Sequence, residues 1–353
     1  MSRFSVIISV VLSALVLVSV YVAGLYYDDS SDPASRRVEI KVLPGATLKD
    51  VQTQLVENGV LKRSGLFRWA AYLTRKERRI QAGRYLFMRG ESVAAVLDKL
   101  ASGAVDYTRV VIPEGFMVTE IAAVLRMEAE IDSAAFMELA YDDSVLARFG
   151  IEAPSLEGYL FPDTYLFSWP LTPRDVIERM VHRFREVYDD SMQALADSVG
   201  FGENEAVTLA SIIQAEAVYD SEMPRISAVY HNRLERGWRL EADPTVAYAI
   251  GGVRRRLYYK DLRAASPYNT YRVHRLPPGP ICSPGRAAIL AAVQPQAGSD
   301  YLYFVADGTG RHYFSKTLRE HLIAKERVRD GSVPWVDEFE EPNAGGEEEV
   351  TSE

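Results

Sequence analysis

Apolar and polar positions divide the chain into one long apolar block followed by many short periodic segments. The block Phe4–Tyr27 contains no charged residue. At about 1.5 Å per helical residue it exceeds the ~30 Å hydrocarbon core of a bilayer. A cleavable signal peptide is the alternative, but its apolar region is ordinarily only about 7–15 residues long. The pattern favours an uncleaved membrane helix in residues 1–27, with Arg3 on the cytoplasmic side and the body outside.

Short periodic segments follow a polar linker at residues 28–37. A strand is predicted at 38–43, a helix capped by Thr47, a second helix at 64–74, a strand at 83–87 and a helix at 92–100. These elements form a compact βααβ unit with one further helix. A strand at 108–112 and a helix at 118–125 come next, after which the segment 172–234 reads as mainly helical.

The last third of the body is predicted to be less regular. Prolines are frequent from Trp238 onward, and few periodic runs remain. A strand at 301–305, a turn at Asp307-Gly308 and a strand at 312–314 predict a hairpin, and a helix at 317–328 closes the body. We therefore expect an α+β fold with a helical core and short antiparallel strands.

The charge of the chain is concentrated at one end. The net charge is −9, and residues 333–353 carry eight acidic and no basic residues. The rest of the chain is close to neutral, which argues against a nucleic-acid partner. The acidic segment, with Pro342 and Gly345-Gly346, is predicted to be a disordered tail.

No common metal, cofactor or nucleophile motif is present. The chain lacks a phosphate-binding loop, a GxSxG elbow and an HExxH helix, and its five histidines have no metal-ligand spacing. Cys282 is the single cysteine, so no intrachain disulfide can form, and we expect it in a core or loop. We predict no metal and no cofactor, and carboxylates remain as the candidates for catalysis.

One carboxylate falls on an apolar helix face. In the helix predicted through 206–218, Glu216 lies three, four and seven residues after Ile213, Ile212 and Leu209. Burial there raises the pKa of a carboxyl, and a carboxylic acid still protonated near pH 7 can cleave a glycosidic bond by general-acid catalysis. Periodicity alone favours the plainer alternative, a glutamate at the rim with its carboxylate in solvent.

Two further segments carry polar groups. A helix is predicted from the capping residues Asp220-Ser221 to Gly237, and His231, Asn232 and Arg233 lie on it. Tyr268-Asn269-Thr270-Tyr271 alternates aromatic and hydrogen-bonding side chains in a loop, as glycan-binding clefts do. Taken alone, each segment is a weak indication.

Taken together, six segments resemble the YceG-like family of endolytic murein transglycosylases. They are EGYLFPDTY (157–165), LASIIQAEA (209–217), HNRL (231–234), ADPTVAYAIG (242–251), SPYNTYRVHRLPPGPICSPG (266–285) and YLYFVADGTGRHYFS (301–315). The resemblance extends over residues 38–329. It implies a LysM-like domain at 38–105, a YceG-like catalytic domain at 106–332, an inner-membrane location with the body in the periplasm, and cleavage within peptidoglycan strands between N-acetylmuramic acid and N-acetylglucosamine.

The resemblance also implies the catalytic residue. The family motif reads ASIIExE, and its second glutamate, the catalytic one, corresponds to Glu216. This chain has Gln214 at the first position, so a carboxylate there is dispensable. The expected product is a 1,6-anhydro sugar. The resemblance also implies a role in limiting the growth of new strands, with peptidoglycan synthases as expected partners. Substrate-binding candidates are Gln214, Asp163, Asn232, Asp243, Tyr268, Asn269 and Thr270.

Two alternatives stay open at this point. One is a hydrolytic muramidase using the same site, which would need a second carboxylate about 5–9.5 Å away. Asp163, Asp243 and Glu157 are available for that role, although each also fits a turn or a cap. The other alternative is a peptidoglycan-binding scaffold without catalysis.

Overall fold

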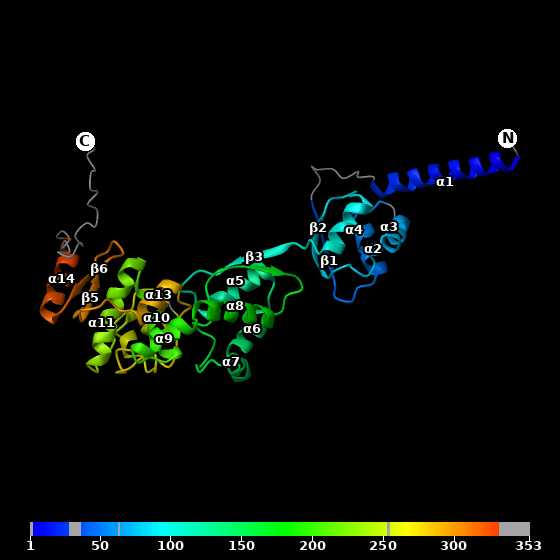
Figure 1. Ribbon diagram of the computed structural model, residues 1–353. Coiled ribbons are helices and arrows are strands. Elements are labelled where there is room, and N and C mark those ends of the chain that lie inside the picture. The colour runs from blue at the N-terminus through cyan, green and yellow to red at the C-terminus, as the bar shows by residue number, and fades with distance from the viewer. Residues whose placement is uncertain (1–2, 28–36, 63, 253–254, 332–353) are drawn as a thin grey trace, which may run out of the picture. The chain divides into compact units, whose positions relative to one another are not determined.

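The computed structural model describes residues 3–27, 37–62, 64–252 and 255–331 (Figure 1). The chain forms two compact units, one of Met1–Ile112, Glu120–Leu139 and Asp163–Arg179, the other of Pro113–Thr119, Ala140–Pro162 and Met180–Glu353. Of the predicted linker only Arg37 is among the described residues, and the predicted acidic tail lies outside them.

The first unit begins with the elements that the sequence predicts. In chain order they are α1 (Arg3–Tyr27), β1 (Val38–Val42), α2 (Leu48–Glu57), α3 (Ser64–Leu73), β2 (Gly83–Phe87) and α4 (Val93–Ser102). β1 and β2 pair antiparallel, with Val38 opposite Phe87. Thr47 and Asp50 form a capping box at the start of α2, and Gly103 ends α4 with a left-handed φ of 69°. The predicted strands and helices of this segment are confirmed.

A separate hydrophobic core holds these elements together. β2 buries alternate residues, which places Tyr85 and Phe87 inside, where they meet Leu55, Phe67 and Leu97. Tyr26, near the end of α1, also packs against this core. Among the residues that the structure describes, no helix has the length and apolar character needed to cross a membrane. The resemblance of residues 38–105 to a LysM domain stays a prediction.

A second antiparallel pair completes the first unit. The next elements in the chain are β3 (Tyr107–Val111), α5 (Val118–Ala129), α6 (Ser133–Ala140), α7 (Asp143–Phe149), β4 (Thr164–Ser168) and α8 (Pro173–Val187). Of these, α7 and residues 180–187 of α8 already belong to the second unit. β4 was not predicted, and it pairs with β3 so that Val111 lies opposite Thr164. Only this pairing shows that its alternating burial, with Tyr165 and Phe167 inside, belongs to a strand.

The second unit is built around one buried helix. Its remaining elements are α9 (Asp190–Ser198), α10 (Glu203–Glu216), the 3₁₀ turn η1 (Asp220–Glu222), α11 (Met223–Glu235), α12 (Asp243–Ala249), the 3₁₀ turn η2 (Asp261–Arg263), α13 (Arg286–Val293), β5 (Tyr303–Ala306), β6 (His312–Ser315) and α14 (Leu318–Asp330). α10 contacts α9, α11, α12 and α13, and every residue from Ala206 to Ile213 is buried. The predicted single apolar stripe is therefore too narrow, because α10 is covered on all sides.

Other expectations for this unit have mixed outcomes. The hairpin is confirmed as β5 paired with β6, with Phe304 opposite Phe314. The capping role of Asp220-Ser221 is wrong, because these residues form η1 and no side chain caps α11. The region after Trp238 is also more regular than predicted, since it contains α12 and α13. The coarse class, a mixed α/β fold of helices with short antiparallel strand pairs, is confirmed.

Candidate active site

Glu216 is the last residue of α10, at the point where the buried helix reaches the surface. Its side chain is partly exposed, although protein fills most of the space around its carboxyl group. Burial raises the pKa of this carboxyl from an ordinary 4.5 to about 7; a hydrogen bond from Tyr230 lowers the pKa, and the charge of Asp243 raises it. The surroundings therefore hold a proton on a group that a substrate can still reach.

The position at the end of α10 acts in the same direction. The last carbonyl groups of a helix carry partial negative charge, which disfavours an anion beside them. Ala217 leaves the helix in an extended conformation, with ψ of 137°, so the chain turns away directly after Glu216. The helix end therefore adds to the effect of burial, and both favour the neutral form of Glu216.

Tyr230 of α11 orients the acid. Its hydroxyl donates a hydrogen bond of 3.2 Å to Oε1 of Glu216, and the side chain is only 1% exposed. Burial also raises the pKa of Tyr230 well above its usual value, so the phenol stays protonated and remains a donor. The sequence placed Tyr230 on the apolar face of its helix, and no local pattern links it to a residue in α10.

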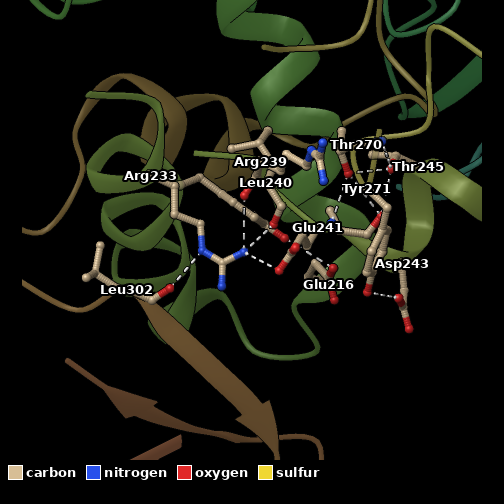
Figure 2. Close-up of polar contacts among 12 residues, drawn as sticks. Glu216, Arg233, Arg239, Leu240, Glu241, Asp243, Thr245, Thr270, Tyr271 and Leu302 are labelled. Carbon is tan, nitrogen blue, oxygen red and sulfur yellow. Dashed lines mark hydrogen bonds and ion pairs between the residues drawn. The ribbon is translucent and has the colours of Figure 1, made fainter. Parts of the chain in front are cut away.

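Asp243 is the second carboxylate of the site, and it begins α12. Tyr271 donates a hydrogen bond of 2.6 Å from its hydroxyl to Oδ1 of Asp243 (Figure 2). Asp243 is exposed, and its charge contributes to the raised pKa of Glu216. Burial, together with the bond to Asp243, raises the pKa of Tyr271. Glu216, Asp243, Tyr230 and Tyr271 thus form one polar cluster in the second unit.

Thr270 and Asn269 hold the loop behind this cluster. The Thr270 hydroxyl accepts from the amide of Ala242 at 2.9 Å and lies 2.8 Å from the Thr245 hydroxyl. The Asn269 amide donates to the carbonyl groups of Leu262 and Ala264. Asn269 and Thr270 are fully buried, so their hydrogen-bond partners in this structure are groups of the surrounding loops and of α12. They fix the backbone that carries Asp243 and Tyr271.

Arg233 of α11 ties the hairpin to the same loop. Figure 2 shows its guanidinium between Leu302 and the segment 239–241, where Nε donates to the Leu302 carbonyl at 2.7 Å and Nη1 to the Leu240 carbonyl at 2.6 Å. Nη1 also lies 3.7 Å from Glu241. Asn232, one residue earlier, donates to the carbonyls of Ser299 and Tyr301. Asn232 therefore holds the backbone of the segment that leads into β5.

Gln214 fastens another loop to the last turn of α10. Its Oε1 accepts from the amide of Gly285 at 2.9 Å, and its side chain also hydrogen-bonds the carboxyl group of Glu114. A Cβ atom at position 285 would lie 1.9 Å from Oε1 of Glu114, so any larger residue there would have to displace the Glu114 side chain. A glutamate at 214 would oppose Glu114, whereas the neutral amide pairs with it. This contact gives Gln214 a structural role. No local sequence pattern pointed to Glu114 as its partner.

The other candidates lie in different surroundings. Asp163 belongs to the first unit, where its carboxylate accepts from the amide of Thr164 at the start of β4. Glu157 is buried in the second unit and accepts from the amide of Val118 at 3.0 Å. Tyr268 packs on Tyr248 with 4.9 Å between ring centroids. None of these three contacts involves Glu216.

Neither the single cysteine nor a cluster of metal ligands adds a second reactive group to the described part of the chain. Cys282 is buried and its thiol donates to the carbonyl of Ser211 at 3.3 Å, so it acts as a core residue. Within the described residues, no group of three or more histidine, cysteine or acidic side chains is arranged to hold a metal ion.

Replacing Tyr230 by phenylalanine should shift the pH profile of the site. The hydrogen bond from Tyr230 lowers the pKa of Glu216, so its loss raises that pKa above about 7 and moves the alkaline limb of activity to higher pH. Loss of orientation should also reduce the maximal rate by about tenfold. The measurement is the pH dependence of kcat on isolated glycan strands.

Tyr188→Phe is the matched control for this prediction. Tyr188 is also a buried tyrosine of the second unit, and its hydroxyl has no hydrogen-bond partner in the described part of the chain. Its removal should leave the pH profile unchanged. If the alkaline limb stays in place in Tyr230→Phe as well, Tyr230 does not tune the acid.

The geometry defines a class of site: a single, partly exposed carboxylic acid held protonated near pH 7, with an oriented tyrosine and a second carboxylate nearby. Comparison with known proteins gives the family. The YceG-like family model matches residues 40–327, and the chain belongs to this family.

Named relatives and a solved structure agree with this assignment. The endolytic murein transglycosylase of Bacillus subtilis is 34% identical over 82% of this chain and 84% of its own length. The endolytic murein transglycosylase of Streptococcus pneumoniae is 26% identical over 88% of this chain and 63% of its own. The crystal structure of a YceG-like protein from Listeria monocytogenes shares 30% identity with a TM-score of 0.57, over 82% of this chain and 99% of that one.

Proposed function

We propose that this protein is an endolytic transglycosylase of peptidoglycan that cleaves the bond between N-acetylmuramic acid and N-acetylglucosamine within glycan strands. The observation that carries the proposal is Glu216, a reachable carboxylic acid with a pKa of about 7. General-acid cleavage of a glycosidic bond needs such a group. The names of the relatives from Bacillus subtilis and Streptococcus pneumoniae support the same activity.

The reaction proceeds in two proton transfers. Glu216 gives its proton to the glycosidic oxygen as the bond from that oxygen to C1 of the muramic acid breaks. The carboxylate of Glu216 then accepts the proton of the C6 hydroxyl, whose oxygen bonds to C1. The product carries a 1,6-anhydro ring, no water is consumed, and Glu216 ends protonated as it began. Tyr230 keeps the carboxyl group oriented throughout.

Asp243 supports the positive charge that develops at C1. It is exposed, and its own hydrogen bond from Tyr271 holds it in place. A fixed negative charge beside an oxocarbenium-like transition state lowers its energy. The arrangement supports direct glycan contacts for Asp243, Tyr271 and the partly exposed Tyr268, and indirect roles for Gln214, Asn232, Asn269 and Thr270, which hold the surrounding loops.

A hydrolytic muramidase is the second candidate, and the nearness of Asp243 to Glu216 favours it. A second carboxylate can activate water in place of the C6 hydroxyl. Mass spectrometry of the released fragments separates the two reactions. We expect muramic acid ends that are lighter than reducing ends by one water. Fragments with ordinary reducing ends would establish hydrolysis, with Asp243 as the base.

The membrane anchor is a further part of the proposal and rests on sequence. No described helix is long and apolar enough to span a bilayer, so the support is the uncharged run Phe4–Tyr27 and the exposed apolar side chains of α1, among them Leu15 and Leu17. An inner-membrane anchor would keep the site in the periplasm, beside growing strands and the synthases that make them. There the enzyme would limit strand length, and the LysM-like unit would support or bind glycan.

A further inference from the structure

The helix α3 exposes an apolar face that nothing in its unit covers. Trp69, Tyr72 and Leu73 are 78%, 53% and 84% exposed, and their spacing puts them on one side of the helix. The opposite side is fixed in the core through Phe67 and Ala71. Large exposed apolar side chains that cluster on a rigid element mark an interaction surface.

Basic residues surround this face. Between residues 62 and 79 the chain has one acidic residue, Glu77, and seven basic ones: Lys62, Arg63, Arg68, Arg75, Lys76, Arg78 and Arg79. Arg68, Arg75, Arg78 and Arg79 are exposed. Arg78 comes no nearer than 4.0 Å to Glu77, and Arg68, Arg75 and Arg79 have no acidic partner within the described residues. These charges are available to an external anion.

The end of α3 keeps its exposed apolar side chains close in the chain to the arginines that follow them. Arg75 has a φ of 56°, a left-handed conformation that glycine usually occupies. The amide of Arg75 donates to Tyr72 and the amide of Lys76 to Ala71, which closes the helix in one turn. The arginines of 75–79 therefore follow directly after the aromatic face.

The helix α1 lies in the same unit and contacts α3 and α4. Tyr26 of α1 hydrogen-bonds Lys76, which also pairs with Asp98 of α4. Beyond this contact, α1 exposes apolar side chains such as Leu15, Leu17 and Tyr21. The aromatic and basic surface of α3 thus lies beside the end of an apolar helix.

We propose that the face of α3 formed by Trp69, Tyr72, Leu73 and the flanking arginines docks onto the surface of an anionic lipid bilayer. Tryptophan and tyrosine favour the boundary between headgroups and acyl chains, where an adjacent leucine is also stabilised. Arginines beside them bind lipid phosphates. A glycan strand would use the aromatic rings, but it offers nothing apolar to Leu73 and no phosphate to the arginines. The inference does not rest on the chemistry of Glu216.

Depth-dependent fluorescence quenching tests the docking in the full-length chain. The protein is reconstituted in vesicles of phosphatidylethanolamine and phosphatidylglycerol, with and without brominated acyl chains. One variant keeps only Trp69 and replaces Trp169, Trp238 and Trp335 by phenylalanine. The matched control keeps only Trp238, which lies in the second unit and is 40% exposed. Brominated lipid should quench Trp69 and leave Trp238 unchanged.

Charge and competition complete the test. Arg68, Arg75 and Arg79 are each replaced by glutamine. Every such substitution should lower the ratio of docked to free states by about fivefold. The inference is overturned if Trp69 is not quenched. It is also overturned if added glycan strands abolish the quenching and excess lipid does not. Flotation of the same samples reports separately whether the chain is anchored, and glycan cleavage in solution reports whether the catalytic proposal holds.

Discussion

Replacing Glu216 by glutamine is expected to abolish glycan cleavage while the protein stays folded. Glutamine has the shape of the protonated acid and can still accept the hydrogen bond from Tyr230. It cannot give a proton to the glycosidic oxygen, and loss of a general acid costs about 10²–10⁴-fold in rate. Release of soluble fragments from purified peptidoglycan measures the effect.

Glu235→Gln is the matched control for this substitution. Glu235 is an exposed glutamate at the end of α11, in the same unit as Glu216. The Glu235→Gln variant should cleave glycan as fast as the unaltered protein. If Glu216→Gln also released fragments at the original rate, Glu216 would not be the acid. If the unaltered protein released nothing, a non-catalytic scaffold would be the better account.

The same residue sets two pH effects that can be measured, and both run in the same direction. The acid is protonated below a pKa of about 7, so cleavage should decline as the pH rises through 7. Because the folded pKa lies above the unfolded value of 4.5, the contribution of Glu216 to stability is fully present below pH 4.5 and is lost as the pH rises to 7. A shift of this size amounts to roughly 3 kcal/mol. Glu216→Gln should therefore become more stable, relative to the unaltered protein, between pH 5 and 8.

Replacing Arg233 by methionine is expected to have the largest effect on stability. Arg233 is only 8% exposed, and its guanidinium serves the carbonyl groups of Leu302 and Leu240. Methionine fills similar space but leaves buried acceptors unpaired, at a cost of about 3 kcal/mol. For a unit of this size, the melting temperature should fall by roughly 6–12 °C. Activity should fall as well, since the segment 240–243 carries Asp243.

Arg236→Met separates this effect from a general loss of charge. Arg236 is exposed, follows α11 directly, and its guanidinium lies 5.9 Å from the ring of Trp238. Its replacement should change the melting temperature by less than about 2 °C, as most surface substitutions do. Equal effects of the two substitutions would show that the buried hydrogen bonds of Arg233 do not hold the hairpin to the site.

Local patterns predicted much of the fold. Thr47 and Thr317 cap the beginnings of α2 and α14, and Gly103 ends α4, through contacts within a few residues. A short turn joins β5 and β6. β4 could not be found in this way, because its partner β3 lies more than fifty residues earlier. α12 and α13 were hidden by the surrounding prolines, and they are stabilised by packing on α10.

For the site, the sequence by itself determined that Glu216 lies on an apolar helix, and its family motif named Glu216 as the acid. Only the tertiary structure decided why this carboxyl keeps its proton: α10 is buried on all sides and ends at Glu216, Tyr230 arrives from another helix, and Asp243 from a loop held by Thr270. The pKa of a group depends on the dielectric and the charges around it, and these come from segments far apart in the chain. The same reason separates Gln214, Asn269 and Asn232, which have loop and backbone partners, from residues exposed to substrate.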